Sequence, residues 1–157
     1  MADAKQLKNA QSVYNTMCAM LDEKNVRYEK HLDDLVVTFT MQGDDIPMHF
    51  IINIDAEREL VRLLSPLPLT FEGESRLNGA IATSCVNYLL ADGSFDFDYN
   101  TGRVLFRMTS SYMDSLLSKE LFEYMVAVAG YTIDEYNDKF LLLAKGKLPI
   151  EEFFKRP

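Results

Sequence analysis

The sequence FDFDYNTGRVLFRM, residues 95–108, decides the fold class of this chain. Apolar and charged side chains alternate with a period of two before and after the turn, which is the pattern of β-strands. If Asp98 pairs with Arg103 across the turn, Phe97 lies opposite Val104 on one face. The other face then carries opposite charges as cross-strand neighbours, namely Asp96, Asp98, Arg103 and Arg107. We therefore predict an antiparallel hairpin with one buried and one solvated face.

Three further strands are predicted upstream of this hairpin. Leu35–Met41 and Met48–Ile54 are rich in β-branched and aromatic residues, and Leu60–Leu64 follows after a short turn. Connections this short join antiparallel neighbours, because a parallel crossover needs a dozen or more residues. Val26–Tyr28 is an additional, shorter candidate strand. We expect Ser65–Pro68 to end this run of strands, because proline cannot donate a hydrogen bond to a central ladder.

Three helices are predicted from apolar residues at spacings of three and four. The first covers residues 4–24 with Asp3 as its N-cap, and the second covers Ser75–Leu90. The third begins after Ser118, and Gly130 either kinks it or splits it. The second helix is expected to turn an apolar stripe toward the core, formed by Leu77, Ile81, Cys85, Tyr88 and Leu89.

Together these elements predict a single α+β domain over residues 1–157, an antiparallel sheet flanked by helices in the order α-β-β-β(-β)-α-β-β-α. A short helical tail is expected at about residues 149–155, opened by Pro149. A chain of 157 residues has an ordinary size for one domain and buries enough surface to fold without metals or disulfides. We accordingly interpret Cys18 and Cys85 as thiols that pack as small apolar side chains rather than as a disulfide.

The charge of the chain limits its partners. It carries 16 Lys and Arg against 24 Asp and Glu, a formal net charge of −8. A field of this sign repels phosphate backbones and anionic membrane surfaces, so we expect neither nucleic acid nor membranes as partners. The uncharged stretch at residues 124–133 is too short to span a bilayer, which takes about 20 apolar residues. Residues 1–10 lack the apolar core of a signal peptide, so a cytoplasmic protein is the default expectation.

No residue pattern demands a particular catalytic or metal chemistry. Residues 96–100 resemble the start of a calcium loop, but Thr101 and Arg107 stand where such a loop needs a glycine and a bidentate glutamate. His31 and His49 have no partner at metal-ligand spacing, as in H-E-x-x-H. We therefore expect no enzyme activity, no cofactor and no metal site.

The stretch Leu77–Gly146 carries a resemblance to a known family. Leu77-Asn78 opens a helix that ends before Gly93, the turn Asn100-Thr101-Gly102 joins two strands, and Ser118–Phe122 begins the last helix. In this order of elements the chain resembles the YbjN family, described as bacterial regulators of sensory transduction. That family is similar in fold to type III secretion chaperones, which are small, acidic and dimeric. The resemblance implies a protein- or peptide-binding module that forms a homodimer, and it brings no functional residues with it.

The leading hypothesis is a non-enzymatic, chaperone- or regulator-like module that binds a polypeptide through a sheet face, a strand edge or a helical groove. The acidic charge favours basic partners. The alternative is a small-ligand sensor, with a pocket of ~300 Å³ or more between the sheet and the helices. The candidate lining residues of that pocket are Phe50, Tyr88, Phe106 and Tyr112. A small enzyme is the third hypothesis, and it needs a cleft that gathers His49 with acidic side chains.

Overall fold

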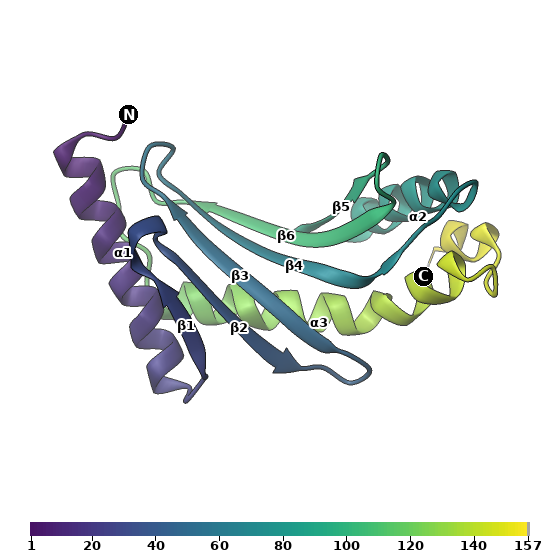
Figure 1. Ribbon diagram of the computed structural model, residues 1–157, viewed down its shortest axis with the longest axis horizontal. Helices are drawn as coiled ribbons and strands as arrows, with labels where there is room; N and C mark the ends of the chain where they lie inside the picture. Colours follow the sequence, from purple (N-terminus) through teal and green to yellow (C-terminus); the bar gives the residue numbers. More distant parts are fainter. Residues whose placement is uncertain (157) are drawn as a thin grey trace.

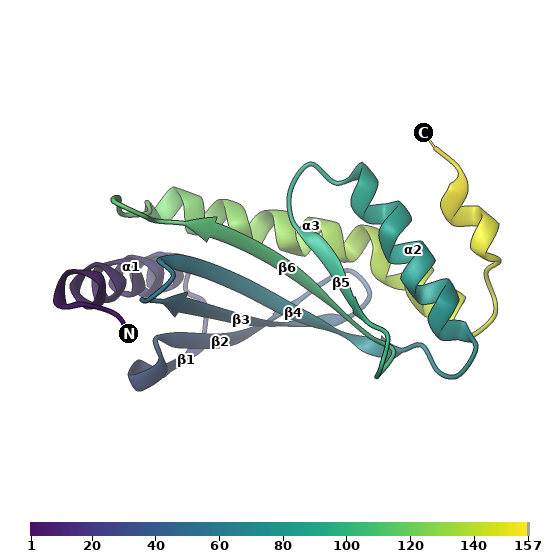
Figure 2. The same ribbon diagram turned by 90° about the horizontal axis from the view of Figure 1, so that it is seen from above.

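The sheet and the helices form two layers, with the helices gathered on one side of the sheet (Figure 1, Figure 2). The structure is a computed structural model that describes residues 1–156. Within these residues six strands form one antiparallel sheet in the order β1-β2-β3-β4-β6-β5. The predicted α+β class with an antiparallel sheet flanked by helices is confirmed. In chain order the elements are α1 (Ala4–Glu23), β1 (Tyr28–His31), η1 (Leu32–Asp34), β2 (Val36–Gln42), β3 (Pro47–Asp55), β4 (Leu60–Thr70), α2 (Ser75–Leu89), β5 (Ser94–Asp98), β6 (Arg103–Ser111), α3 (Lys119–Ala144) and η2 (Ile150–Phe154).

The hairpin of β5 and β6 has the predicted register. Asp98 pairs with Arg103 and Phe97 with Val104, so the phenylalanines face the core. The predicted charge pairing holds for Asp96, whose carboxylate accepts from Arg107 Nε at 2.6 Å. Asp98 has a different role, because it accepts from the Asn100 N–H at 3.0 Å and from the Thr101 hydroxyl at 2.9 Å. Those two bonds close the turn between the strands.

Strand β4 continues past the point where its end was predicted. It runs over Leu60–Thr70 through Pro66 and Pro68, so the prediction that Ser65–Pro68 ends the run of strands is wrong. The physical reason is that β3 no longer pairs with β4 beyond Leu64, so on that side the prolines leave no ladder bond unmade. β6 alone borders this segment, and its register with β4 shifts there.

The helix starts follow the capping signals in the sequence. Asp3 accepts from the Gln6 N–H at 2.8 Å while the Gln6 side chain accepts from the Asp3 N–H at 2.9 Å, which is a capping box. Ser118 caps α3 by accepting from the Leu121 N–H at 3.1 Å. α3 passes through Gly130 as one helix over Lys119–Ala144, so of the two alternatives, a kink or a split, the split is wrong (Figure 1).

The additional candidate strand is present but displaced along the chain. β1 begins at Tyr28, where the candidate Val26–Tyr28 ends, and runs to His31 along the edge of the sheet. The C-terminal tail also forms, as the 3₁₀ turn η2, which begins directly after Pro149.

The core lies between the sheet and the helices and is centred on Phe95. Its ring meets the rings of Phe106, Phe140 and Tyr136 edge to face, with centroids 5.1, 5.0 and 5.9 Å away. Such T-shaped pairs suit the aromatic quadrupole. They connect β5, β6 and α3 into one packed unit.

Helix α2 is rotated relative to the prediction. Its buried residues are small or short, namely Gly79, Ala82, Thr83 and Val86. The predicted inward stripe from Leu77 to Leu89 is wrong, because its members are half-buried or exposed at the surface. The physical reason is the close approach of α2 to the sheet: a Cβ placed on Gly79 would lie 2.6 Å from a ring carbon of Phe97. Large side chains do not fit on that side of the helix.

Candidate binding surfaces

The rotation of α2 leaves an apolar stripe on the outside of the molecule. We define the α2 stripe as Leu77, Ile81 and Tyr88, which recur at helical spacing on one side of the helix. Leu77 is 57% exposed and Tyr88 is 73% exposed, while Ile81 is half-buried. Apolar residues aligned in this way are typical of interaction surfaces, whereas single exposed apolar residues are not informative.

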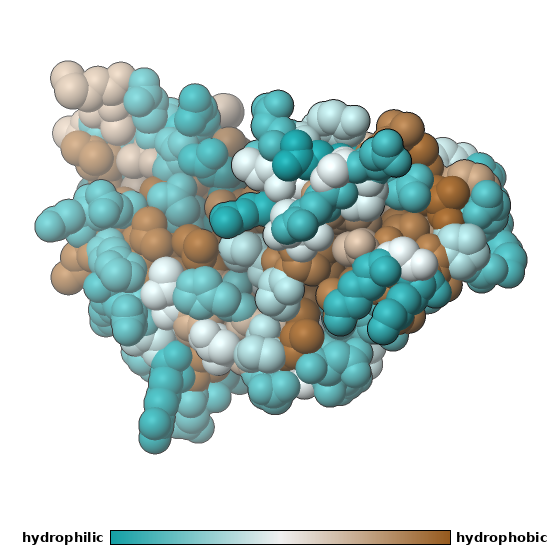
Figure 3. Space-filling view, turned by 45° about the vertical axis from the view of Figure 1, so that its right-hand side comes forward, coloured by the Kyte–Doolittle hydropathy of each residue, from teal (hydrophilic) through white to brown (hydrophobic). Residues whose placement is uncertain are grey.

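The second surface is the face of the sheet opposite the helices. In the part of the chain that the structure describes, this face is not covered by a helix (Figure 2). Ile51 pairs directly with Leu64 there, and Leu105 lies beside Pro66 in the next row. An oblique space-filling view shows apolar patches between polar side chains (Figure 3). The bare face is therefore mixed in polarity, with apolar side chains available for contact.

A groove lies in this bare face where β4 and β6 lose register. We call it the sheet groove; its volume is about 650 Å³. Its lining includes one row of residues across three strands, namely Pro66 on β4, Leu105 on β6 and Asp96 on β5. Asp98 and Arg103 lie in the next row toward the turn. The groove thus combines an apolar floor with charged groups at its edge.

The electrostatics of the sheet groove favour a negative Asp98. The Thr101 hydroxyl and the Asn100 N–H donate to its carboxylate and hold its pKa below the usual value. Asp96 is neutralised by its ion pair with Arg107. Asp98 makes no ion pair within the described residues, although Arg103 lies opposite it and the charge of Arg76 also acts on its pKa.

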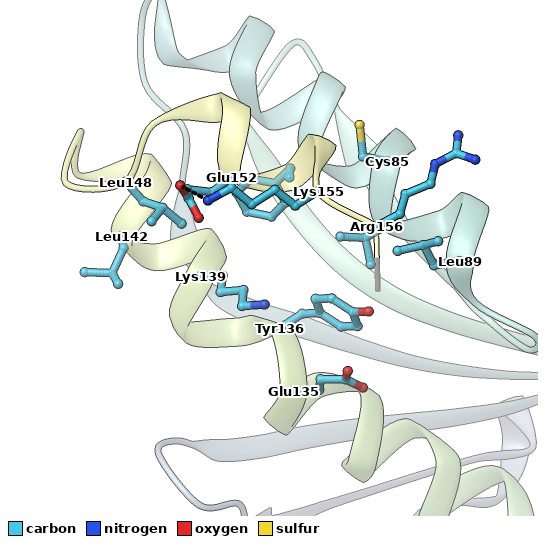
Figure 4. Close-up of a pocket in the computed structure, with 12 residues that line it drawn as sticks. Cys85, Leu89, Glu135, Tyr136, Lys139, Leu142, Leu148, Glu152, Lys155 and Arg156 are labelled. Carbon is cyan, nitrogen blue, oxygen red and sulfur yellow. Dashed lines mark hydrogen bonds and ion pairs between the residues drawn. The ribbon is translucent and has the colours of Figure 1, made fainter.

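The third surface is a groove between α2, α3 and the C-terminal segment, which we define as residues 148–156 (Figure 4). We call it the α2–α3 groove. One hollow in it has a volume of about 450 Å³. Cys85 and Leu89 line it from α2, and Tyr136 and Lys139 from α3. Burial raises the pKa of Tyr136, and the charge of nearby Glu135 adds to that shift.

The C-terminal segment lies across this groove. The ring of Phe153 stacks on that of Phe140 in α3, with centroids 5.7 Å apart and an angle of 12° between the planes. The Arg156 guanidinium lies over the Tyr88 ring at 4.9 Å. Lys155 pairs with Glu152 within the segment at 2.7 Å. The segment therefore touches α3 through an aromatic ring and α2 through a cation.

The four sequence-predicted pocket residues are placed in different environments. Phe50, Phe106 and Tyr112 are fully buried. Phe50 stacks on Phe39 at 5.2 Å, and the Tyr112 hydroxyl donates to the Asp55 carbonyl at 3.0 Å. Only Tyr88 of the four borders a hollow, a smaller one of about 350 Å³ beside the C-terminal segment. The structure brings the other three into the core and does not group them with Tyr88.

The sequence prediction missed the C-terminal segment as part of a site. The signal for it is the apolar pair Phe153-Phe154 inside an otherwise charged tail. An apolar pair in such a context indicates docking onto the rest of the fold, but it does not identify the surface that receives it.

The histidines and the acidic clusters form no metal site in residues 1–156. His49 lies on the bare face with its Nδ1 atom 3.3 Å from the Thr40 hydroxyl, and His31 Nε2 lies 3.5 Å from the Thr38 hydroxyl. Both imidazoles thus have a threonine neighbour on an adjacent strand. Among the same residues, helices long and apolar enough to cross a membrane are absent.

Known structures share this fold at low sequence identity. A chain of the ExsC–ExsE complex superposes with a TM-score of 0.62 and 16% identity, over 84% of this chain and 96% of that one. YbjN from E. coli gives a TM-score of 0.60 and 13% identity, over 85% and 91%. A chain of the HopA1–SchA chaperone–effector complex superposes with a TM-score of 0.55 and 15% identity, over 88% of this chain and 99% of that one. No family model and no curated protein sequence matches the chain. The chain has a YbjN-like, secretion-chaperone-like fold, which confirms the predicted resemblance.

Proposed function

We propose that this protein is a non-enzymatic polypeptide-binding module, chaperone- or regulator-like, that acts as a homodimer. The observation that carries the proposal is the sheet groove in the bare face of the sheet. Two of the similar structures are complexes of two proteins, ExsC with ExsE and HopA1 with SchA, which supports a polypeptide as the partner.

The groove specifies the chemistry of the partner segment. An extended chain turns alternate side chains toward a surface, so when an apolar side chain reaches Leu105 and Pro66, the side chain two positions along reaches Asp98. The charge of Asp98 and the net charge of −8 both favour a cation at that position. The proposed partner is an extended segment that carries an apolar residue two positions away from Lys or Arg.

A defined peptide tests this proposal. A short fluorescent peptide that repeats Leu-Gly-Lys-Gly, here the Leu–Lys peptide, is expected to bind, and one that repeats Leu-Gly-Glu-Gly is not, as measured by fluorescence anisotropy. The variants Asp98→Lys and Leu105→Asp should each lower the affinity for the Leu–Lys peptide by roughly tenfold or more. Leu116→Asp, a change at an exposed leucine outside the groove, serves as the control. Equal binding of both peptides, or an unchanged affinity in Asp98→Lys, contradicts the proposal.

The homodimer is proposed to form through Leu77 and Ile81 of the α2 stripe, because the Tyr88 ring is already in contact with the Arg156 guanidinium. In a dimer with a two-fold axis, the same patch of each copy forms the interface. The apolar outer side of α2 can therefore pack against the same side of α2 in a second copy. Leu77→Glu should convert the dimer to a monomer, because it places a charge in an apolar contact. Tyr131→Glu on α3 is the matched control, because Tyr131 is exposed outside the stripe. Light scattering after gel filtration measures the mass. A monomeric wild-type protein, or a Leu77→Glu variant that stays dimeric, contradicts the dimer proposal.

Small-ligand sensing is the second candidate function, favoured by the hollow of about 450 Å³ in the α2–α3 groove. This volume lies in the range of small-molecule sites. The hollow has an apolar wall and the polar groups of Tyr136, Lys139 and Glu135 at its mouth (Figure 4). It adjoins the hollow lined by Tyr88, the one sequence-predicted pocket residue found at a cavity.

A further inference from the structure

The C-terminal segment occupies the α2–α3 groove without filling it. Hollows of about 450 and 350 Å³ lie beside it, and both are lined by Cys85, Leu89 and Phe153. Both hollows are open to the surface and are not enclosed voids. The groove is therefore larger than the segment that lies in it.

Phe153 and Arg156 make the aromatic and cationic contacts of the segment, and Ile150 packs against the core beside them. Phe153 is half-buried and stacks on Phe140, whereas its neighbour Phe154 is 54% exposed. Three positions after Phe153, the Arg156 guanidinium lies over the Tyr88 ring. The groove thus recognises an aromatic residue followed three positions later by a cation.

The backbone of the segment is weakly held. Among the hydrogen bonds within residues 1–156, none joins residues 148–156 to another part of the chain. The bonds that the segment does make are internal, from the Glu152 N–H to the Pro149 carbonyl and from Lys155 to Glu152. It follows Gly146, which adopts a positive φ of 69° as α3 ends. A segment held by side-chain contacts of Ile150, Phe153 and Arg156, without backbone hydrogen bonds to the core, opens at low free-energy cost relative to the core.

We propose that the α2–α3 groove is a docking site for a short peptide segment of the partner polypeptide, one that carries an aromatic residue followed three positions later by Arg or Lys, and that residues 148–156 are its built-in competitor. This inference rests on the proposed polypeptide-binding function and assigns it a second, regulated contact. The intramolecular competitor acts at a high effective concentration, so a partner segment binds with an apparent affinity reduced by the fraction of closed groove.

The two cysteines provide a direct readout of groove opening. The Cys85 thiol lines both hollows beside Phe153, whereas Cys18 is buried in the core. Alkylation of the full-length protein by iodoacetamide, followed by mass spectrometry, reports each thiol separately. Phe153→Ala should raise the alkylation rate of Cys85 by roughly tenfold, because it removes the ring that stacks on Phe140. Cys18 should stay unreactive, which shows that the variant remains folded.

Phe154→Ala is the matched control for this measurement. It removes the same ring from the neighbouring residue, which does not stack on Phe140, so the Cys85 rate should change little. An equal effect of both substitutions, or no effect of Phe153→Ala, overturns the assignment of the anchor. If Cys18 becomes reactive in Phe153→Ala, the conservative variant Phe153→Leu replaces it, with an intermediate Cys85 rate expected.

A synthetic peptide with the sequence of residues 148–156 tests the site itself. Added to the Phe153→Ala protein, it should protect Cys85, and the same peptide with alanine at the position of Phe153 should not. The wild-type protein should need roughly tenfold more peptide for the same protection. Absence of protection, or equal protection of both proteins, overturns the proposal. Protection of Cys85 by decanoate but not by the peptide overturns it in favour of a small ligand. The Leu–Lys peptide at the sheet groove is measured separately, so failure here leaves the proposed function standing.

Discussion

The side chain of Asn87 in α2 satisfies both backbone polar groups of Phe95 in the edge strand β5. Its Oδ1 atom accepts from the Phe95 N–H at 2.7 Å, and its Nδ2 atom donates to the Phe95 carbonyl at 2.9 Å. The carboxamide thereby takes the place of a neighbouring strand. An edge strand otherwise presents these groups to other chains, so Asn87 closes this edge of the sheet.

Replacing Asn87 by alanine should open that edge. Phe95 lies in the core, and its unpaired backbone groups should lower the free energy of unfolding by about 1–3 kcal/mol. Urea denaturation measures the loss, and hydrogen exchange should show faster exchange at the Phe95 amide. Asn78→Ala is the control on the same helix, because its side chain makes no hydrogen bond within the described residues. Equal stability of the two variants contradicts the assigned role of Asn87.

Two glycines in helices should respond in opposite directions to alanine. Gly130 in α3 has no atom within 4 Å of an added Cβ among the described residues, so Gly130→Ala should stabilise the fold by roughly 0.5–1 kcal/mol through helix propensity. A Cβ on Gly79 would lie 2.6 Å from the Phe97 ring, so Gly79→Ala should destabilise the fold by about 1–3 kcal/mol. Thermal unfolding measures both. A stabilising Gly79→Ala would show that α2 and β5 are not packed as closely as described.

Asp55 should make stability depend on pH in the acidic range. The Arg58 N–H donates to its carboxylate at 2.9 Å, Arg62 pairs with it at 3.0 Å, and its pKa lies below the ordinary value of 3.8. A carboxyl group with a lowered folded pKa stabilises the fold above its unfolded pKa, and that contribution disappears as the pH falls through the folded pKa.

The variant Asp55→Asn tests this linkage. Its free energy of unfolding should be lower than that of the wild type by about 1–2 kcal/mol at pH 7. This difference in free energy should shrink below about pH 4. Chemical denaturation at a series of pH values measures the gap. Asp45→Asn, at an exposed turn position, is the control and should leave the free energy of unfolding at pH 7 nearly unchanged. A gap that is constant down to acidic pH would exclude the charge of Asp55 as its source.

Asp134 in α3 should hold the tip of the β2–β3 hairpin against the helix. Its carboxylate accepts from the Asp44 N–H at 2.9 Å. Asp134→Ala should speed hydrogen exchange at the Asp44 amide and lower stability by about 1 kcal/mol. Asp138→Ala is the comparison, because that carboxylate accepts only from the next residue's N–H within the described chain. Unchanged exchange at Asp44 in Asp134→Ala would show that the tip is held by other contacts.

The sequence predicts those parts of the fold that depend on residues close together in the chain. The register of β5 with β6 follows from alternation around one turn, so the pairing of Asp98 with Arg103 needs no knowledge of the rest of the chain. The caps at Asp3 and Ser118 are similarly local, because each side chain bonds a backbone N–H three residues onward.

The orientation of α2 is not local information. Helical periodicity identifies the apolar stripe around Leu77 but does not say whether the chain itself or another molecule covers it. The close approach of the helix to Phe97 selects small residues such as Gly79, and that constraint depends on strands that follow later in the chain. Phe50 and Phe106, two of the predicted pocket residues, lie in the core, and their burial likewise depends on how the sheet and the helices pack.

The course of β4 depends equally on its neighbours. Pro66 and Pro68 are incompatible with a strand bonded on both sides, but β3 does not extend alongside them. The α2–α3 groove is a further case, because α2, α3 and the C-terminal tail meet there only in the folded chain. The sequence therefore predicts the elements, whereas the binding surfaces arise from how they are packed.

The prolines of β4 have a consequence for synthesis on the ribosome. β6, the neighbour of this part of β4, is made only after α2 and β5, so at about 5–20 residues per second the nascent β4 waits for several seconds without a partner. During that interval its open edge is exposed to other nascent chains on the same messenger RNA. Pro66 and Pro68 remove two backbone donors from the edge that β6 does not take and so discourage pairing with such chains on that side. They protect the protein at a stage when its fold does not yet exist.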